Sequence, residues 1–176
     1  MPSYRIATPA DPAPCWAMRT DALRVGCATH YPPATVEALC AAAPPASMPG
    51  LFAAGGAIVA EEDGRIVGYA VLDRTSGKID AVFVSPACQG RGIARRLLAG
   101  LEAMAAERGI SHLFLSASLN AAPFYERAGF LHVRDALYRH RGGFFMASVY
   151  MEKQLALPAG TAALSGSGSD APPGRR

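Results

Sequence analysis

Short runs of β-branched and aromatic residues, separated by turn residues, mark the first half of the chain. Residues 57–62 and 65–73 are two such runs, and the Asp63-Gly64 pair between them is a strong hairpin signal. A second turn at residues 75–78 leads into a third run, residues 79–84. The pattern therefore predicts three consecutive strands that pair as an antiparallel meander.

The hydrophobic period changes to that of a helix over residues 92–108. Apolar residues fall on one face of this segment and charged residues on the other, and Gly109 predicts its end. The apolar face comprises Ile93, Ala94, Leu97, Leu98, Leu101, Met104 and Ala105. A further β run, residues 111–118, follows this helix, and such a crossover favours right-handed parallel pairing with the strand at 79–84.

The segment before the meander is predicted to form one strand and two helices. Residues 4–8 are a short β run, and residues 11–26 have helical character with Asp11 as the N-cap. A second short helix is expected over residues 34–42. Three prolines at positions 44, 45 and 49 are then expected to prevent regular structure before the meander.

The segment after residue 118 is predicted to form a short helix and a closing pair of strands. The helix spans residues 121–128, with Asn120 as its N-cap and Gly129 as its stop. The strands are expected over residues 130–138 and 144–153.

Composition limits the class of protein. The chain has 176 residues, of which 51% are hydrophobic, and this suits one folded domain. From about residue 156 the sequence turns to Ala, Gly, Ser and Pro, so residues 1–155 are expected to form the domain and residues 156–176 a disordered tail. The net charge of +3 is too small to indicate nucleic acid as the main partner.

Neither the cysteines nor the N-terminus indicates a secreted, metal-binding or membrane protein. The four cysteines form no C-x-x-C pair and no histidine lies at zinc-ligand spacing, so reduced cysteines and no metal are expected. Charged residues interrupt any signal-peptide core, and no uncharged stretch is apolar enough to span a bilayer. A cytoplasmic protein with no membrane partner is the expectation.

The most informative segment joins the third strand of the meander to the long helix. Residues 82–94 read Val-Phe-Val-Ser-Pro-Ala-Cys-Gln-Gly-Arg-Gly-Ile-Ala, a β run followed by a glycine loop and a helix start. The free N–H groups and the dipole at a helix N-terminus attract an anion, and Gly90 and Gly92 let the backbone approach it closely. A phosphorylated ligand is therefore predicted at residues 89–94.

Two common phosphate loops do not fit this segment. A P-loop needs Lys followed by Ser or Thr after its last glycine, whereas Ile93 follows Gly92 here. The Rossmann fingerprint needs a third Gly or Ala where this chain has Arg95. The spacing Gln89-x-x-Gly92-x-Ala94 instead resembles the Q/R-x-x-G-x-G/A acyl-CoA pyrophosphate loop of the GNAT superfamily of N-acetyltransferases.

A second match lies downstream of this loop. Residues 120–130, Asn-Ala-Ala-Pro-Phe-Tyr-Glu-Arg-Ala-Gly-Phe, are similar to the short helix and FYE-x-x-GF ending of many GNAT members. The resemblance covers about residues 4–155. It implies a mixed α/β, GNAT-like fold: a central six- or seven-stranded, largely antiparallel sheet with one splayed parallel pair, flanked by about four helices.

The resemblance also implies acetyl-CoA as cosubstrate and assigns residues to it. The backbone of Phe83 and Val84 would pair with the pantetheine arm, and one of their amides would stabilise the thioester oxyanion. Asn120 would contact the same arm. The pyrophosphate would be held by Gln89, Gly90, Arg91, Gly92, Ile93 and Ala94, with a solvated loop position as the alternative for the Arg91 side chain.

Acyl transfer to an amine requires one proton to leave the amine and another to reach the thiolate. Tyr125 occupies the family's frequent general-acid position, and a phenol of ordinary pKa, about 10, is protonated at neutral pH. Asp80 lies near a position where relatives often carry an acidic residue that acts through water or binds the amine, and a surface role is equally open for it. Glu61 and Glu62 are lesser candidates for the base.

The first two helices and the last hairpin build the acceptor pocket in this superfamily. Here they correspond to residues 27–31 and 138–145, with His30 and Tyr31 as candidate acceptor-binding residues.

The leading interpretation is an acetyl-CoA-dependent N-acetyltransferase acting on a primary amine of a small molecule or peptide by direct attack in a ternary complex. A longer-chain acyltransferase, a non-catalytic acyl-CoA sensor and a module for another phosphorylated ligand stay open as alternatives. The sequence names neither the acceptor nor the oligomeric state, although homodimers are common on this fold.

Overall fold

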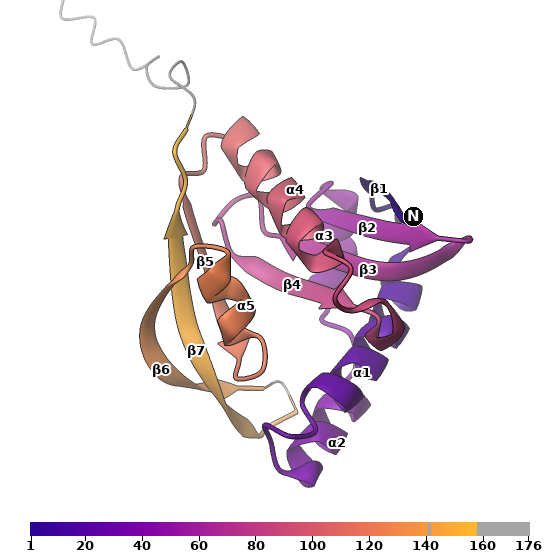
Figure 1. Cartoon of the computed structure of the whole chain (residues 1–176), viewed down its shortest axis with the longest axis vertical. Coiled ribbons are helices and arrows are strands. Elements are labelled where there is room, and N and C mark those ends of the chain that lie inside the picture. Colours follow the sequence, from indigo (N-terminus) through magenta and orange to yellow (C-terminus); the bar gives the residue numbers. More distant parts are fainter. Residues whose placement is uncertain (141, 158–176) are drawn as a thin grey trace, which may run out of the picture.

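The computed structural model describes residues 1–140 and 142–157 (Figure 1). In this part of the chain the strands form two antiparallel sheets, one with the order β1-β2-β3-β4 and one with the order β5-β7-β6. The strands are β1 (Ser3–Ile6), β2 (Ala57–Glu62), β3 (Arg65–Leu72), β4 (Ile79–Val84), β5 (His112–Ser118), β6 (Leu131–Arg139) and β7 (Phe145–Gln154). The tail predicted at residues 156–176 falls almost wholly outside the described residues.

Five α-helices accompany these sheets within the described residues. They are α1 (Pro12–Gly26), α2 (Pro33–Ala41), α3 (Met48–Ala53), α4 (Ile93–Glu107) and α5 (Ala122–Arg127). A 3-10 turn, η1 (Pro86–Cys88), follows β4. The predicted elements are therefore present with shifts of only a few residues at their ends, and α3 is an additional element.

Helix α3 shows that the expectation of irregular structure around the three prolines was wrong. Pro49 stands in the first turn of α3, where N–H groups have no intrahelical acceptor, so a proline removes no hydrogen bond there. Met48 and Phe52 are buried, and the Phe52 ring lies 6.4 Å from the ring of Tyr69 on β3. Burial of these two side chains stabilises a helix that is too short to form alone.

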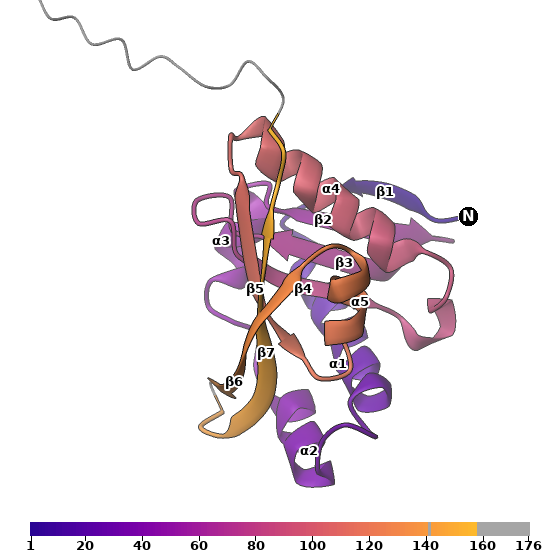
Figure 2. The same ribbon diagram turned by 60° about the vertical axis from the view of Figure 1, so that its left-hand side comes forward.

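Helices cover both faces of the first sheet. Along β3, Tyr69 and Val71 pack in the cluster formed with α1 and α3, whereas Ala70 and Leu72 pack in the cluster formed with α4. This alternation follows from the period of two in a strand. Figure 2 shows α4 lying across the first sheet. Gly68 permits this close approach, because a Cβ there would lie 3.1 Å from side-chain atoms of α4.

The two sheets meet at one point and then separate (Figure 1). A parallel bridge pairs Lys78 with Phe114, and the Phe114 N–H donates to the Gly77 carbonyl at 3.2 Å. Beyond this bridge β4 pairs with β3, β5 pairs with β7, and no ladder joins β4 to β5 in the described part of the chain. The expected splayed pair is therefore present, and the mixed α/β fold class is confirmed. One backbone edge of β4 is left open.

Two predicted helix caps are formed differently. Asp11 occupies the N-cap position of α1, but its carboxylate accepts hydrogen bonds from Arg5 and from the Thr8 N–H (2.6 Å) instead of capping the helix. The Arg5 guanidinium holds the pKa of the Asp11 carboxyl well below its ordinary value. The N-cap of α5 is Ala121, and the side chain of Asn120 instead contacts Cys27, the residue after α1.

Candidate active site

The loop between β4 and α4 presents open backbone at a helix N-terminus. Gly90 and Gly92 have φ values of 75° and 77°, a left-handed conformation that glycine adopts without strain. Gly92 is the N-cap of α4, and no side chain caps the first turn. A Cβ built at either glycine would meet no atom within 4 Å, so the space beside the loop is free. These features suit an anion bound by first-turn N–H groups.

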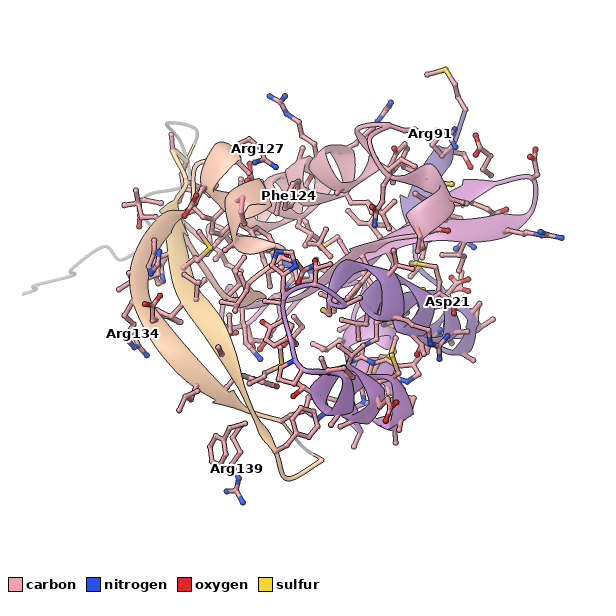
Figure 3. All side chains as sticks on the ribbon, turned by 60° about the horizontal axis from the view of Figure 1, so that its bottom comes forward. Asp21, Arg91, Phe124, Arg127, Arg134 and Arg139 are labelled. Atoms are coloured by element: carbon pink, nitrogen blue, oxygen red, sulfur yellow. The ribbon has the colours of Figure 1, made fainter. Side chains whose placement is uncertain are left out.

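Arg91 in the same loop is engaged by a carboxylate. Its Nη1 and Nη2 donate to the two carboxylate oxygens of Glu62, at the end of β2, over 2.8 and 2.7 Å. The pair lowers the pKa of the Glu62 carboxyl to about 2. Figure 3 shows Arg91 beside the β2–β3 hairpin. Arg91 therefore ties the loop to the hairpin, and its charge is already matched.

The open edge of β4 has a definite set of backbone groups. The Ser85 N–H donates to the Val67 carbonyl at 2.9 Å, so the backbone groups of Ser85 point toward β3. Because direction alternates along an antiparallel ladder, Phe83 also points its N–H and C=O toward β3, whereas Val82 and Val84 point theirs toward the open edge. The open edge thus offers the amides of Val84 and Val82, and the amide of Phe83 belongs to the ladder.

Tyr125 lies on α5 in the same core cluster as Val82 and Val84 of β4. Its ring packs edge-on against Phe124 and Phe130, with ring centroids 5.0 and 5.6 Å away (Phe124 is labelled in Figure 3). Burial raises the pKa of the Tyr125 phenol well above its ordinary value, so the hydroxyl is protonated at neutral pH. Among the described residues this hydroxyl has no hydrogen-bond partner, which leaves it able to donate to a ligand.

Asp80 stands at the other end of β4. Val71 pairs with Ala81 and Leu72 pairs with Ile79, so Asp80 is the extra residue of a β-bulge. Its carboxylate forms an ion pair with Lys78 at 2.6 Å, next to the bridge where the sheets meet. At a rise of roughly 3.3 Å per residue it lies about 13 Å along the strand from Val84. The structure does not bring Asp80 to the open half of the edge.

The two segments predicted to build the acceptor pocket come together in one cluster. Cys27 and Tyr31 pack with Met146 and Phe144 of the last hairpin, and Phe83 of β4 touches the same cluster. This places the α1–α2 connection next to the splayed strands.

The side chains of the α1–α2 connection have different environments. His30 is exposed, and its Nδ1 lies 3.1 Å from the Thr29 hydroxyl. The Tyr31 side chain is buried: its hydroxyl donates to the Ala147 carbonyl at 2.7 Å and accepts from the Leu119 N–H at 2.8 Å. Tyr31 therefore joins this connection to β7 and to the residue after β5.

Sequence reasoning missed two residues that shape the site. Glu62 was considered only as a base, although its contact is with Arg91. Val82 was not among the residues assigned to the pantetheine arm, although its backbone faces the open edge. The direction of each β4 amide follows from its ladder with β3. A prediction of the β3–β4 register from the sequence would therefore have shown that the backbone of Val82 faces the open edge.

Two further observations bear on the class of protein. Among the described residues no group of three or more His, Cys, Asp and Glu side chains is placed to hold a metal ion. The same residues include no helix that is both long and apolar enough to cross a membrane.

Comparison with known proteins agrees with this geometry. The acetyltransferase (GNAT) domain family matches residues 27–155. A crystal structure of a GCN5-related N-acetyltransferase from Rhodopseudomonas palustris, titled "Aminotransferase, Class-II", is 30% identical, with a TM-score of 0.76 over 88% of this chain and 96% of that one. The fold and loop thus define an acyltransferase domain. The chain belongs to the GNAT acetyltransferase family, which confirms the resemblance inferred from the two motifs.

Two other proteins are similar to this chain. The uncharacterized N-acetyltransferase YafP of Escherichia coli (strain K12) is 36% identical over 74 residues, which are 42% of this chain and 46% of that protein, so the match spans less than half of YafP. The structure of yncA, a putative acetyltransferase from Salmonella typhimurium with its cofactor acetyl-CoA, has the same fold, with a TM-score of 0.60, 23% identity and coverage of 93% and 99% of the two chains.

Proposed function

We propose that this chain is an acetyl-CoA-dependent N-acetyltransferase that acetylates a primary amine of a small molecule or a peptide by direct attack in a ternary complex. The observation that carries the proposal is the uncapped N-terminus of α4 placed directly after the open edge of β4. A diphosphate suits the uncapped helix N-terminus, and the amide-containing pantetheine arm suits the open strand edge. The structural relative from Salmonella typhimurium holds acetyl-CoA on the same fold.

The donor would be held mainly by backbone. The first-turn N–H groups at Gly92, Ile93 and Ala94 would bind the pyrophosphate, with Gln89 and Gly90 completing the loop. The free N–H and C=O groups of Val82 and Val84 would pair with the pantetheine arm as an added strand pairs with a sheet edge. Asn120 remains a predicted contact to that arm.

The transfer itself moves two protons. The amine nitrogen would attack the thioester carbonyl carbon, and the amide of Val84 would stabilise the resulting oxyanion. As the C–S bond breaks, the Tyr125 hydroxyl would donate its proton to the leaving thiolate, and a proton released by the amine would restore the phenol. Asp80 lies too far along β4 to touch an amine near Val84, so in this proposal water carries the amine's proton back to the Tyr125 phenolate.

The acceptor would enter between the α1–α2 connection and the last hairpin. Exposed His30 is available to contact it, whereas buried Tyr31 would shape the wall of the site through its two backbone contacts. Cytoplasmic location and the absence of a nucleic-acid partner stay predictions of the sequence.

Calorimetry and a thiol-release assay test this function together. Acetyl-CoA should bind more tightly than ATP, and thiol release should depend on an added amine from a panel of polyamines, amino acids, aminoglycosides and peptides. Tighter binding of ATP would contradict the assignment of the loop. Acetyl-CoA binding without turnover across the panel would favour a sensor, and faster turnover of a longer acyl-CoA would favour a longer-chain acyltransferase.

A homodimer formed through β6 is also proposed, because the free edge of this strand is self-complementary. The His140 N–H donates to the Phe144 carbonyl on the neighbouring strand, so alternation points the backbone groups of Asp135, Leu137 and Arg139 away from β7. Leu137 is 72% exposed. Two copies of β6 can pair antiparallel with Leu137 of one copy opposite Leu137 of the other. Asp135 of each copy then lies opposite Arg139 of the other copy, and these opposite charges attract.

A further inference from the structure

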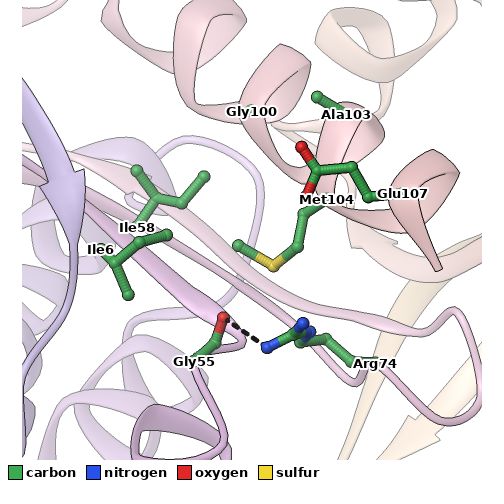
Figure 4. A pocket seen from close by; sticks show the side chains of 8 residues that line it. All are labelled: Ile6, Gly55, Ile58, Arg74, Gly100, Ala103, Met104 and Glu107. Atoms are coloured by element: carbon green, nitrogen blue, oxygen red, sulfur yellow. Dashed lines mark hydrogen bonds between the residues drawn. The ribbon is translucent and has the colours of Figure 1, made fainter.

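A hollow on the far half of α4 lies outside the acyl-CoA site. Its volume is about 330 Å³, which is within the size range of small-molecule pockets. It is lined by Ile6, Gly55, Ile58, Arg74, Gly100, Ala103, Met104 and Glu107 (Figure 4). Glu107 is about 22 Å along the helix from the phosphate loop, at ~1.5 Å per residue. The hollow is therefore a separate feature of the fold.

Arg74 brings a positive charge to the hollow. Its Nη1 donates to the Ala54 carbonyl at 2.6 Å and to the Gly55 carbonyl at 3.3 Å, the carbonyls that follow α3. Its Nε is buried and has no hydrogen-bond partner within the described residues. No carboxylate in this part of the chain forms an ion pair with Arg74. The Nη2 group makes no hydrogen bond within the described residues and is the donor that remains for an anion such as a carboxylate.

Glu107 brings the opposite charge to the same hollow. It is the last residue of α4, where the helix dipole disfavours a negative side chain. Its carboxylate has no hydrogen-bond or ion-pair partner among the residues that the structure describes, and it does not pair with Arg74. An ammonium group bound beside Glu107 would relieve this unfavourable position.

The rest of the hollow is apolar. Figure 4 shows Ile6 and Ile58 to the left of Met104, with the Arg74 guanidinium below Met104 and the Glu107 carboxylate above it. A Cβ added at Gly100 would lie 2.6 Å from Ile58 Cδ1, so glycine at this position leaves room for the isoleucine side chain. A ligand that fills this space needs a branched apolar group at one end and paired charges at the other.

We propose that the hollow binds a free α-amino acid with an apolar side chain. Its carboxylate would accept from Nη2 of Arg74, its ammonium would donate to Glu107, and its side chain would contact Ile6, Ile58 and Met104. A phosphate or dicarboxylate would be repelled by Glu107, and an alkylamine would leave the Arg74 guanidinium without a negative partner. The zwitterion matches both charges, and this inference does not depend on the proposed acetyl transfer.

L-leucine is titrated into the protein, and its binding is detected by NMR of ¹³C-labelled methionine methyl groups. The signal that disappears in the Met104→Leu variant is that of Met104. Leucine should shift this signal in a saturable way. The two analogues 4-methylpentanoate, which lacks the ammonium, and 3-methylbutylamine, which lacks the carboxylate, should each bind about tenfold more weakly or worse, because each loses one charge-assisted contact. Equal affinity of leucine and either analogue, or no saturable shift with leucine, would overturn the proposal.

Two variants test the site without disturbing the end of α3. Ala103→Met fills the hollow from an exposed helix position with a residue of good helix propensity, and it should abolish leucine binding. Glu107→Gln should weaken leucine binding about tenfold, whereas the matched change Glu126→Gln, at an exposed position on α5 outside the hollow, should leave it unchanged. Leucine binding that survives Ala103→Met would place the ligand elsewhere. Acetyl-CoA titrated into the same variants should bind as before, which separates this test from that of the proposed enzyme.

Discussion

Both terminal guanidinium nitrogens of Arg91 are hydrogen-bonded to the carboxylate of Glu62, 29 residues earlier in the chain. Arg91 lies in the loop that is expected to hold a pyrophosphate, so its charge would be the obvious contact for that anion. The structure gives this charge a partner on the β2–β3 hairpin instead. Binding of the pyrophosphate would then rest on backbone N–H groups, and the loop arginine would act as a tie.

Arg91→Gln should therefore have a small effect on acetyl-CoA. We expect the KM for acetyl-CoA to rise by no more than about threefold, because an exposed ion pair contributes about 1 kcal/mol or less. Glu62→Gln should lower this KM slightly, since it frees the Arg91 charge for the anion. Steady-state kinetics at fixed acceptor measure both effects, and a tenfold rise with Arg91→Gln would show that the arginine grips the phosphates directly.

Gly92→Val should raise the KM for acetyl-CoA by about tenfold or more, because a branched side chain would occupy the free space where the anion is expected. Gly64→Val is the matched control, since Gly64 has a similar φ of 72° and equally free surroundings in the β2–β3 turn. Both variants carry the strain of a β-branched residue in the left-handed region, about 1–2 kcal/mol. If the two variants have the same KM, the pyrophosphate does not bind at Gly92.

Tyr125→Phe should lower kcat by about 100-fold and leave the KM for acetyl-CoA nearly unchanged, because the hydroxyl would act only as the thiolate leaves. The free energy of unfolding should change little, since the hydroxyl has no partner among the described residues. Tyr69→Phe is the control, because Tyr69 is also buried and burial also raises the pKa of its phenol. Thiol release at saturating substrates gives kcat, and an unchanged kcat for Tyr125→Phe would exclude the acid role.

Tyr31→Phe should act on stability. Its hydroxyl connects the Leu119 N–H and the Ala147 carbonyl, and removing it leaves a buried amide without an acceptor. We expect the free energy of unfolding to fall by about 1–3 kcal/mol, measured by urea denaturation. His30→Ala, one residue earlier and exposed, should cost much less. A Tyr31→Phe variant as stable as the parent would mean that water replaces the hydroxyl.

Leu137→Lys should dissociate the proposed dimer, because two lysines would face each other at the centre of the paired β6 edges. Leu131→Lys is the matched control: both leucines are 72% exposed on the same strand, and residue 131 lies outside the charge-matched register. Light scattering after size-exclusion chromatography measures the mass. A monomeric parent protein would contradict the dimer, and dissociation by both variants would contradict this register.

Local features of the molecule could be predicted from the residues alone. Asp63-Gly64 forms the expected turn, and the glycine loop with Arg91 directly precedes α4 as expected. Such features depend on the conformational preferences of a few neighbouring residues, which any part of the sequence displays. The GNAT resemblance rested on the same kind of local signal. The prediction failed at Pro49 because burial of Phe52 stabilises a helix that local preference disfavours.

Other features are decided by packing between distant segments. The link from Tyr31 to Leu119 spans 88 residues, and the hollow beside α4 brings Arg74 next to a helix end. Whether Phe83 or Val84 faces the open edge depends on the ladder with β3, because a shift of one residue reverses every amide. Sequence patterns thus determined most of the elements, the position of the glycine loop before α4 and the family. The partners of each charge and the backbone groups left open are set by the three-dimensional contacts, because they depend on residues that meet only after the chain has folded.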